Sequence, residues 1–154
     1  MTQLKKRAIW TLAIWSFVLL GLCIVFFSQG GAATFLDGET RVTVTRSFLT
    51  AGYFFYFLML ILTRKGPGGQ PVLTDERDDL IIKRALMSAF YILLVYVFLI
   101  NMVLYLFYKI HLKTTVMPVG WMWFLGVSAF CIGYIGHAGS ILIQNARMGG
   151  NAEG

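Results

Sequence analysis

The chain has few charged residues, and this scarcity excludes an ordinary soluble domain. Only 13% of its 154 residues are Asp, Glu, Lys or Arg, against about 25% in a typical soluble domain. The mean hydropathy is +0.73. A chain of this length corresponds to one domain, and its basic residues form no cluster within a soluble unit. We therefore expect a single integral membrane domain over residues 1–154 and no nucleic-acid partner.

Cysteine and histidine are also scarce, which limits redox and metal chemistry. Cys23 and Cys131 both fall in apolar segments and form no C-x-x-C pair, so four-helix quinone-linked thiol oxidoreductases are disfavoured. Buried cysteines of this kind act as small hydrophobic side chains. His111 and His137 lie too far apart along their helices to share one haem within a chain. We expect no enzyme activity, cofactor or metal, although a haem held by His137 from two subunits is an open alternative.

The apolar residues are gathered in four segments, approximately 8–28, 47–63, 86–108 and 120–143. A membrane-crossing helix needs about 20 mostly apolar residues, within a range of about 17–25. The second segment is the shortest and can extend back into residues 42–45. Residues 40–45 alternate Thr and Arg with Val, which also allows a short extended piece. The predicted fold class is all-α, a four-helix transmembrane bundle.

The first apolar segment follows Lys5, Lys6 and Arg7, as the apolar region of a secretory signal peptide would. Such regions run for about 7–15 residues, whereas residues 8–27 continue for twenty without a charge. The small residues at 31–33 leave cleavage open, but the length favours a retained helix.

Lys and Arg are unequally divided between the two sides that this topology creates. Nine lie on the side of the termini, namely Lys5, Lys6, Arg7, Arg64, Lys65, Arg77, Lys83, Arg84 and Arg147. Four lie on the other side, namely Arg41, Arg46, Lys109 and Lys113. Because cytoplasmic loops are enriched in basic residues, both termini are predicted to be cytoplasmic. The basic side is also expected to attract anionic lipid headgroups.

Small and polar residues share one face of the fourth segment. At about 100° per residue they fall within an arc of about 100°; they are Gly126, Ala129, Gly133, Gly136, His137, Ser140 and Gln144. Membrane helices approach each other closely through such faces. We expect this stripe to pack against another helix, either in the same chain or in a second copy.

Two polar residues inside the spans are candidates for function. His137 is the only titratable group well inside a span, cysteines aside, and such residues are functional hypotheses by default. The alternative is a neutral imidazole bonded to a backbone carbonyl or to Ser140. Asn101 lies near the middle of the third span, where a buried amide is expected to bond to another helix. Asn101 and His137 differ in depth by about 13 Å, at about 1.5 Å per residue, so a direct hydrogen bond between them is not expected.

The densest group of charges precedes the third span. Residues 74–84 read TDERDDLIIKR and hold seven charged residues, namely Asp75, Glu76, Arg77, Asp78, Asp79, Lys83 and Arg84. Thr74 or Asp75 is a suitable N-cap, and acidic residues in the first turns oppose the helix dipole favourably. A helical wheel puts Asp75, Glu76, Asp79 and Lys83 on one side and Arg77 and Arg84 on the other. The segment is predicted to be a capped helix start that anchors at the membrane surface and docks a partner.

This segment resembles a motif in an uncharacterised family of small prokaryotic membrane proteins. The resemblance covers about twelve residues, with Asp75-Glu76-Arg77-Asp78 and then Ile81 matching a DERD-x-x-I pattern ahead of a hydrophobic hairpin. It implies a bacterial or archaeal inner-membrane origin and carries no activity or site residues.

The sequence thus favours a non-enzymatic accessory or structural membrane subunit that self-associates or joins a larger complex. A small channel or proton-coupled transporter using His137 and Asn101 is the alternative, and a membrane enzyme or haem protein is a third.

Overall fold

The computed structural model describes residues 3–28, 30–33, 39–63, 76–114 and 116–150 of the chain. This part contains no strand and four long helices, α1 (Gln3–Ser28), α2 (Glu39–Leu62), α3 (Glu76–Ile110) and α4 (Val119–Gly150), with a short 3₁₀ helix η1 (Gly31–Ala33) after α1. The predicted all-α, four-helix fold class is therefore confirmed.

All four helices are long and apolar enough to cross a membrane, over Gln3–Ser28, Val42–Leu62, Glu76–Ile110 and Val119–Arg147. This is the helical layout of a multi-pass membrane protein. The 35 residues of α3 extend for about 52 Å at about 1.5 Å per residue. A bilayer core is about 30 Å thick, so α3 is longer than the apolar layer that it could cross.

The prediction of an extended piece at residues 40–45 is wrong, because α2 begins at Glu39 and runs through them. Hydroxyl groups in this polar first half bond to carbonyls of their own helix. Ser47 Oγ donates to the Thr43 carbonyl and Thr50 Oγ1 to the Arg46 carbonyl, each at 2.9 Å. The Thr45 side chain is fully buried. Local bonds and this burial therefore let a polar stretch continue the apolar helix.

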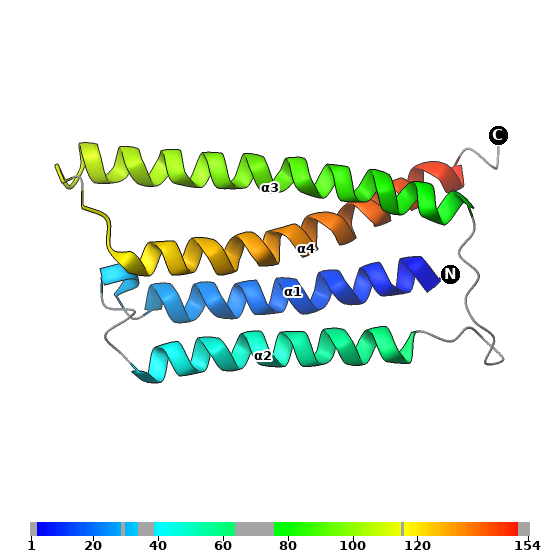
Figure 1. The fold of residues 1–154 in the computed structure, drawn as a ribbon, viewed down its shortest axis with the longest axis horizontal. Helices are drawn as coiled ribbons and strands as arrows, with labels where there is room; N and C mark the ends of the chain where they lie inside the picture. The colour runs from blue at the N-terminus through cyan, green and yellow to red at the C-terminus, as the bar shows by residue number, and fades with distance from the viewer. Residues whose placement is uncertain (1–2, 29, 34–38, 64–75, 115, 151–154) are drawn as a thin grey trace.

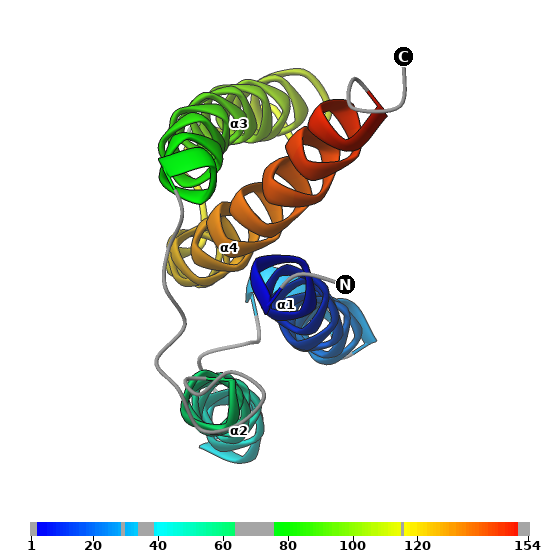
Figure 2. The same cartoon turned by 90° about the vertical axis from the view of Figure 1, so that its right-hand side faces the viewer.

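The helices lie side by side in the order α3, α4, α1, α2 (Figures 1 and 2). Helices α1 and α4 form the central pair, with α3 packed on α4 and α2 packed on α1. The start of α1 and the end of α4 lie at the same end of this row (Figure 1), which we call the terminal end. Helices α3 and α2 form its two edges.

Three buried clusters follow one another along α1. The first, near the terminal end, joins α1, α3 and α4 through Ala8, Ile81, Ala85, Ala138 and Ile141. The middle cluster consists of Trp15, Val18 and Cys131, and the third of Leu22, Phe26, Ala32 and Phe124.

Trp15 is the largest fully buried side chain and connects three helices. Its ring stacks on Tyr134 of α4 at 4.6 Å between centroids and meets Tyr53 of α2 edge-on at 5.2 Å. Since the clusters all include α1, this helix holds the row together.

Glycines allow the tight turn between α1 and η1, and they allow α4 to pack closely against η1. Gly30 and Gly31 have positive φ angles of 94° and 69°, which glycine adopts at little cost. Farther along the chain, the first turn of α4 lies against η1, where the Ala32 carbonyl oxygen fills the space that a Cβ on Gly120 would need. A glycine is therefore required at position 120 for this backbone contact.

Candidate functional site

The charged segment starts α3 at the terminal end of the row. Thr74 and Asp75 lie outside the described residues, so the structure does not describe the predicted N-cap. The charged side chains are exposed at Glu76, Arg77, Asp79, Lys83 and Arg84, while Asp78 is half-buried.

The same segment also contains a core residue that the charge pattern did not single out. Ile81 is fully buried with Ala85, against Ala8 of α1 and Ala138 of α4. The isoleucine of the DERD-x-x-I pattern thus fixes the start of α3 to the central pair, and the charges project around it.

The described residues contain no group of three His, Cys, Asp or Glu side chains that could hold a metal ion. Both cysteines are free, with Cys131 buried beside Trp15 and Cys23 half-buried on α1. The geometry therefore offers no constellation for metal or disulfide chemistry in this part of the chain.

The stripe on α4 divides into a packed part and an open part. Gly136 lies against Ile92 of α3, at 3.4 Å from a Cβ placed on the glycine, and Ser140 is buried. By contrast, a Cβ on Gly126 or Gly133 meets no atom of the described residues within 4 Å. Ala129 is half-buried between these positions. The stripe is therefore not one continuous contact face within the chain.

His137 and Asn101 are not brought together. His137 is half-buried on α4, next to Gly136, whose neighbour on α3 is Ile92. Asn101 follows Ile92 by nine residues (101 minus 92), or about 13 Å along the helix at about 1.5 Å per residue. The two side chains lie at different depths.

Asn101 lies at the exposed edge of the row. Its Nδ2 donates to the Val97 carbonyl of the same helix at 2.7 Å, and its side chain is exposed. The expectation that this amide is buried between helices is therefore wrong for the single chain, because α3 packs on α4 through a different face.

That packed face contains hydrogen bonds between side chains of α3 and α4 that the sequence did not predict. Ser128 Oγ donates to the Phe124 carbonyl, and it lies 2.6 Å from the Tyr96 hydroxyl, which then donates to it. Farther from the terminal end, Trp121 Nε1 donates to the Tyr108 hydroxyl at 2.9 Å. A serine in mid-span was the available signal for the first link.

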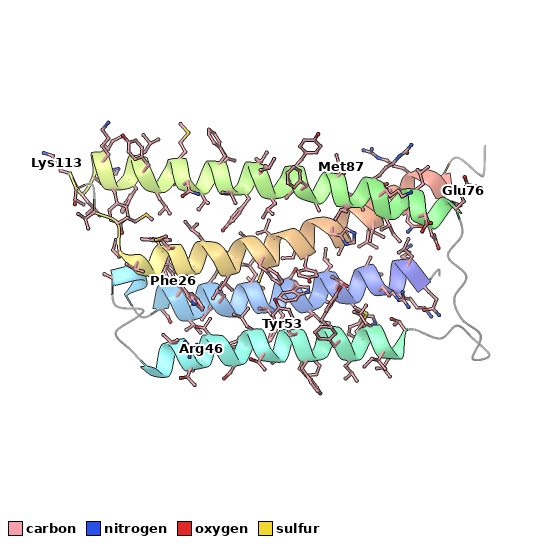
Figure 3. The ribbon with its side chains drawn as sticks, in the orientation of Figure 1. Phe26, Arg46, Tyr53, Glu76, Met87 and Lys113 are labelled. Carbon is pink, nitrogen blue, oxygen red and sulfur yellow. The ribbon has the colours of Figure 1, made fainter. Side chains whose placement is uncertain are left out.

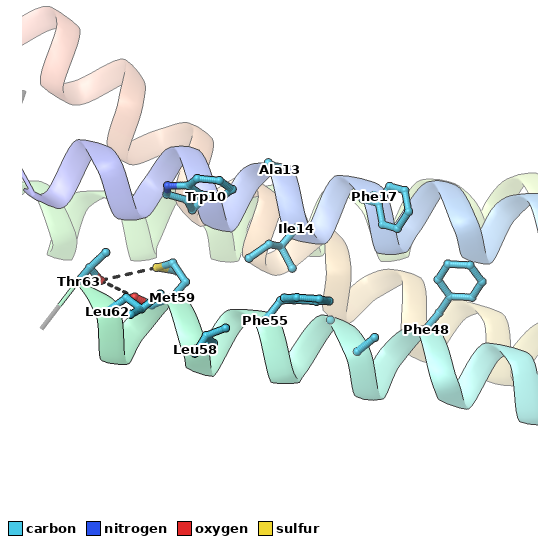
Figure 4. A pocket seen from close by; sticks show the side chains of 12 residues that line it. Trp10, Ala13, Ile14, Phe17, Phe48, Phe55, Leu58, Met59, Leu62 and Thr63 are labelled. Atoms are coloured by element: carbon cyan, nitrogen blue, oxygen red, sulfur yellow. Dashed lines mark hydrogen bonds between the residues drawn. The ribbon is translucent and has the colours of Figure 1, made fainter.

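A groove between α1 and α2 was also missed, because it is made of residues that are ordinary in any membrane helix. It has a volume of about 540 Å³. Figure 4 shows Trp10 and Thr63 near one end, Ile14 opposite Phe55 in the middle, and Phe17 and Phe48 at the other end.

Arg7 connects the two helices at the terminal end of this groove. Its Nε donates to Thr63 Oγ1 at 2.9 Å, and its Nη2 donates to the Thr63 carbonyl. A cationic group is thus fixed beside an apolar groove.

A scan against protein-family models gives no match, and no curated protein or solved structure matches the chain.

Proposed function

We propose that this protein is a non-enzymatic membrane subunit that associates with a second copy of itself through the outer face of α3. The observation that carries the proposal is the exposed amide of Asn101, which lies within the predicted span of α3, a helix that packs mainly against α4. A polar side chain facing hydrocarbon is costly, and a second helix over this face would supply its missing bonds.

The residues around Asn101 have the spacing of a helix–helix contact. Steps of three and four residues alternate along Met87, Phe90, Leu94, Val97 and Asn101, which we call the α3 outer stripe. The four apolar members are between 41% and 56% exposed, and Figure 3 marks Met87 on α3, on the half of the helix nearer the terminal end. Alternating steps of three and four keep one face turned toward a partner helix.

The chemistry of the amide favours a second copy over an unrelated helix. After its bond to the Val97 carbonyl, Asn101 retains one N–H donor and its Oδ1 acceptor. Copies inserted in the same orientation bring identical residues to the same depth around a two-fold axis. Each amide can then donate to the Oδ1 of the other, and a single asparagine in such a stripe fixes the register.

The remaining assignments follow from charge and from the resemblance noted above. The unequal division of Lys and Arg supports termini in the cytoplasm, and the DERD-x-x-I pattern supports a bacterial or archaeal inner membrane. The exposed charges before Ile81 are suited to a partner or to anionic headgroups. The difference in depth between His137 and Asn101 argues against a shared proton path, so a transporter is the weaker candidate.

Cysteine cross-linking tests the contact directly. In a chain with Cys23 and Cys131 replaced by alanine, we expect single cysteines at Leu94, Val97 or Asn101 to form disulfide-linked dimers in membranes. Matched cysteines at Val95, Leu99 and Met102, on the opposite flank of α3, should remain monomeric. Equal cross-linking of both sets would refute a defined α3 contact.

The amide has its own test. Asn101→Val should weaken dimerisation in detergent about three- to tenfold, since an interhelical hydrogen bond contributes about 0.6–1.4 kcal/mol. The association constant is measured by analytical ultracentrifugation, with Leu99→Val as the control. An unchanged constant would show that the amide does not join the two copies.

A further inference from the structure

We propose that the groove between α1 and α2 binds one acyl chain of an anionic phospholipid, whose headgroup phosphate lies beside Lys6 and Arg7. The site lies at the opposite edge of the row from α3 (Figure 2). It is therefore independent of the proposed self-association.

The interior of the groove is suited to a hydrocarbon chain. Its lining is almost entirely apolar, from Trp10 to Phe17 on α1 and from Phe48 to Thr63 on α2. The fifteen residue steps from position 48 to position 63 extend for about 22 Å at about 1.5 Å per step. One leaflet contributes about 15 Å, half of a core about 30 Å thick. The groove is thus long enough for the chain of a lipid in the leaflet at the terminal end.

The terminal mouth of the groove supplies the groups that a phosphate requires. Arg7 uses two of its five N–H donors on Thr63, which leaves three for another acceptor. The Lys6 side chain is exposed one residue before it. Guanidinium groups bind phosphate oxygens through paired hydrogen bonds, and the Thr63 bonds hold this guanidinium in position.

Trp10 strengthens the assignment of this mouth to the membrane surface. It is 59% exposed and lines the groove at the same end as Thr63 (Figure 4), the residue to which Arg7 donates. Tryptophan favours the level of the lipid headgroups, where its ring is apolar and its N–H meets polar groups. Apolar walls, an interfacial tryptophan and two cations are thus arranged in the order of a phospholipid from chain to headgroup.

Native mass spectrometry of the intact chain tests this site. The protein is purified in detergent and titrated with phosphatidylglycerol or with phosphatidylcholine of the same acyl chains. We expect one phosphatidylglycerol to be retained per chain, at least fivefold more tightly than phosphatidylcholine. Equal retention of the two lipids would overturn the proposal, because it would indicate a nonspecific lipid shell.

Two variants separate the headgroup from the chain. Lys6→Gln should reduce the preference for phosphatidylglycerol about fivefold, as one basic residue at a lipid surface does, while Lys83→Gln at the terminal end of α3 should leave it unchanged. Ala13→Phe fills the groove and should abolish retention, while Ala146→Phe, at an exposed position outside it, should not.

Ala51→Phe fills the same groove from α2 and serves if Ala13→Phe fails to fold. Retention that persists in a folded groove variant would place the lipid elsewhere and overturn the proposal. Loss of a dimer in these variants, with lipid retention unchanged, would identify a second copy as the occupant and would overturn it as well.

Discussion

The central helix α1 and the edge helix α3 are equally apolar, with a mean hydropathy of 2.4 in the most apolar window of each, but they are packed differently. In their most apolar windows, 28% of the residues of α1 and of α4 are buried, compared with 6% for α3. Both central helices place aromatic rings in the interior, whereas the rings of Phe90, Tyr91 and Phe98 on α3 are exposed. Hydrophobicity alone therefore does not identify an interior helix in a membrane protein.

The difference shows what holds this chain together. Lipid is as apolar as leucine, so helices in a membrane associate through close packing and interhelical hydrogen bonds. The central pair has ring stacking and buried alanines, while α3 is attached along one face by Ile81, Ala85 and the Tyr96–Ser128 link. The outer face of α3 is exposed in the single chain.

The largest effect is expected when one aromatic ring is removed from each region. Trp15→Ala should lower the free energy of unfolding by about 3–5 kcal/mol, because it empties a fully packed site. Phe98→Ala on α3, where the ring is 67% exposed, should change it by less than about 0.5 kcal/mol. Unfolding in mixed micelles measures both, and similar losses would contradict the division into an interior pair and an edge.

A second test compares two glycines of α4. Gly120→Val should cost about 2–3 kcal/mol of unfolding free energy, since its side chain would overlap the Ala32 carbonyl and the backbone must move. Gly126→Val should cost less than about 0.5 kcal/mol, because a Cβ there has no neighbour within 4 Å in the part of the chain that the structure describes. A large loss at Gly126 in the monomer would mean that the open part of the stripe is packed after all.

The smallest expected effect concerns the attachment of α3 to α4. Tyr96→Phe removes the hydroxyl that lies 2.6 Å from Ser128 Oγ and should cost about 1 kcal/mol. Tyr91→Phe, on the exposed side of α3, provides the matched control. Hydrogen exchange of the α3 amides should increase in the first variant alone, and an equal response would show that the link does not attach the helix.

Much of the fold was predictable because its signals are local. Each of the four spans is defined by its length and apolarity, and the helix start before Ile81 is marked by its acidic residues. The polar first half of α2 was harder, since its helix depends on the burial of Thr45 as well as on local hydroxyl bonds. Sequence reasoning placed His137 and Asn101 at different depths, but it expected Asn101 to bond to another helix, whereas its amide donates to the Val97 carbonyl of its own helix.

The sequence by itself determined that this chain is a set of four helices suited to a membrane, with an excess of basic residues on the side of its termini. Only the tertiary structure decided which faces meet, which glycines are required and where a groove remains. The reason is that these helices are apolar on nearly every side, so periodicity does not mark an interior face. Contacts are chosen by the fit of particular side chains, such as Trp15 on Tyr134, and such fit exists only when the helices are together.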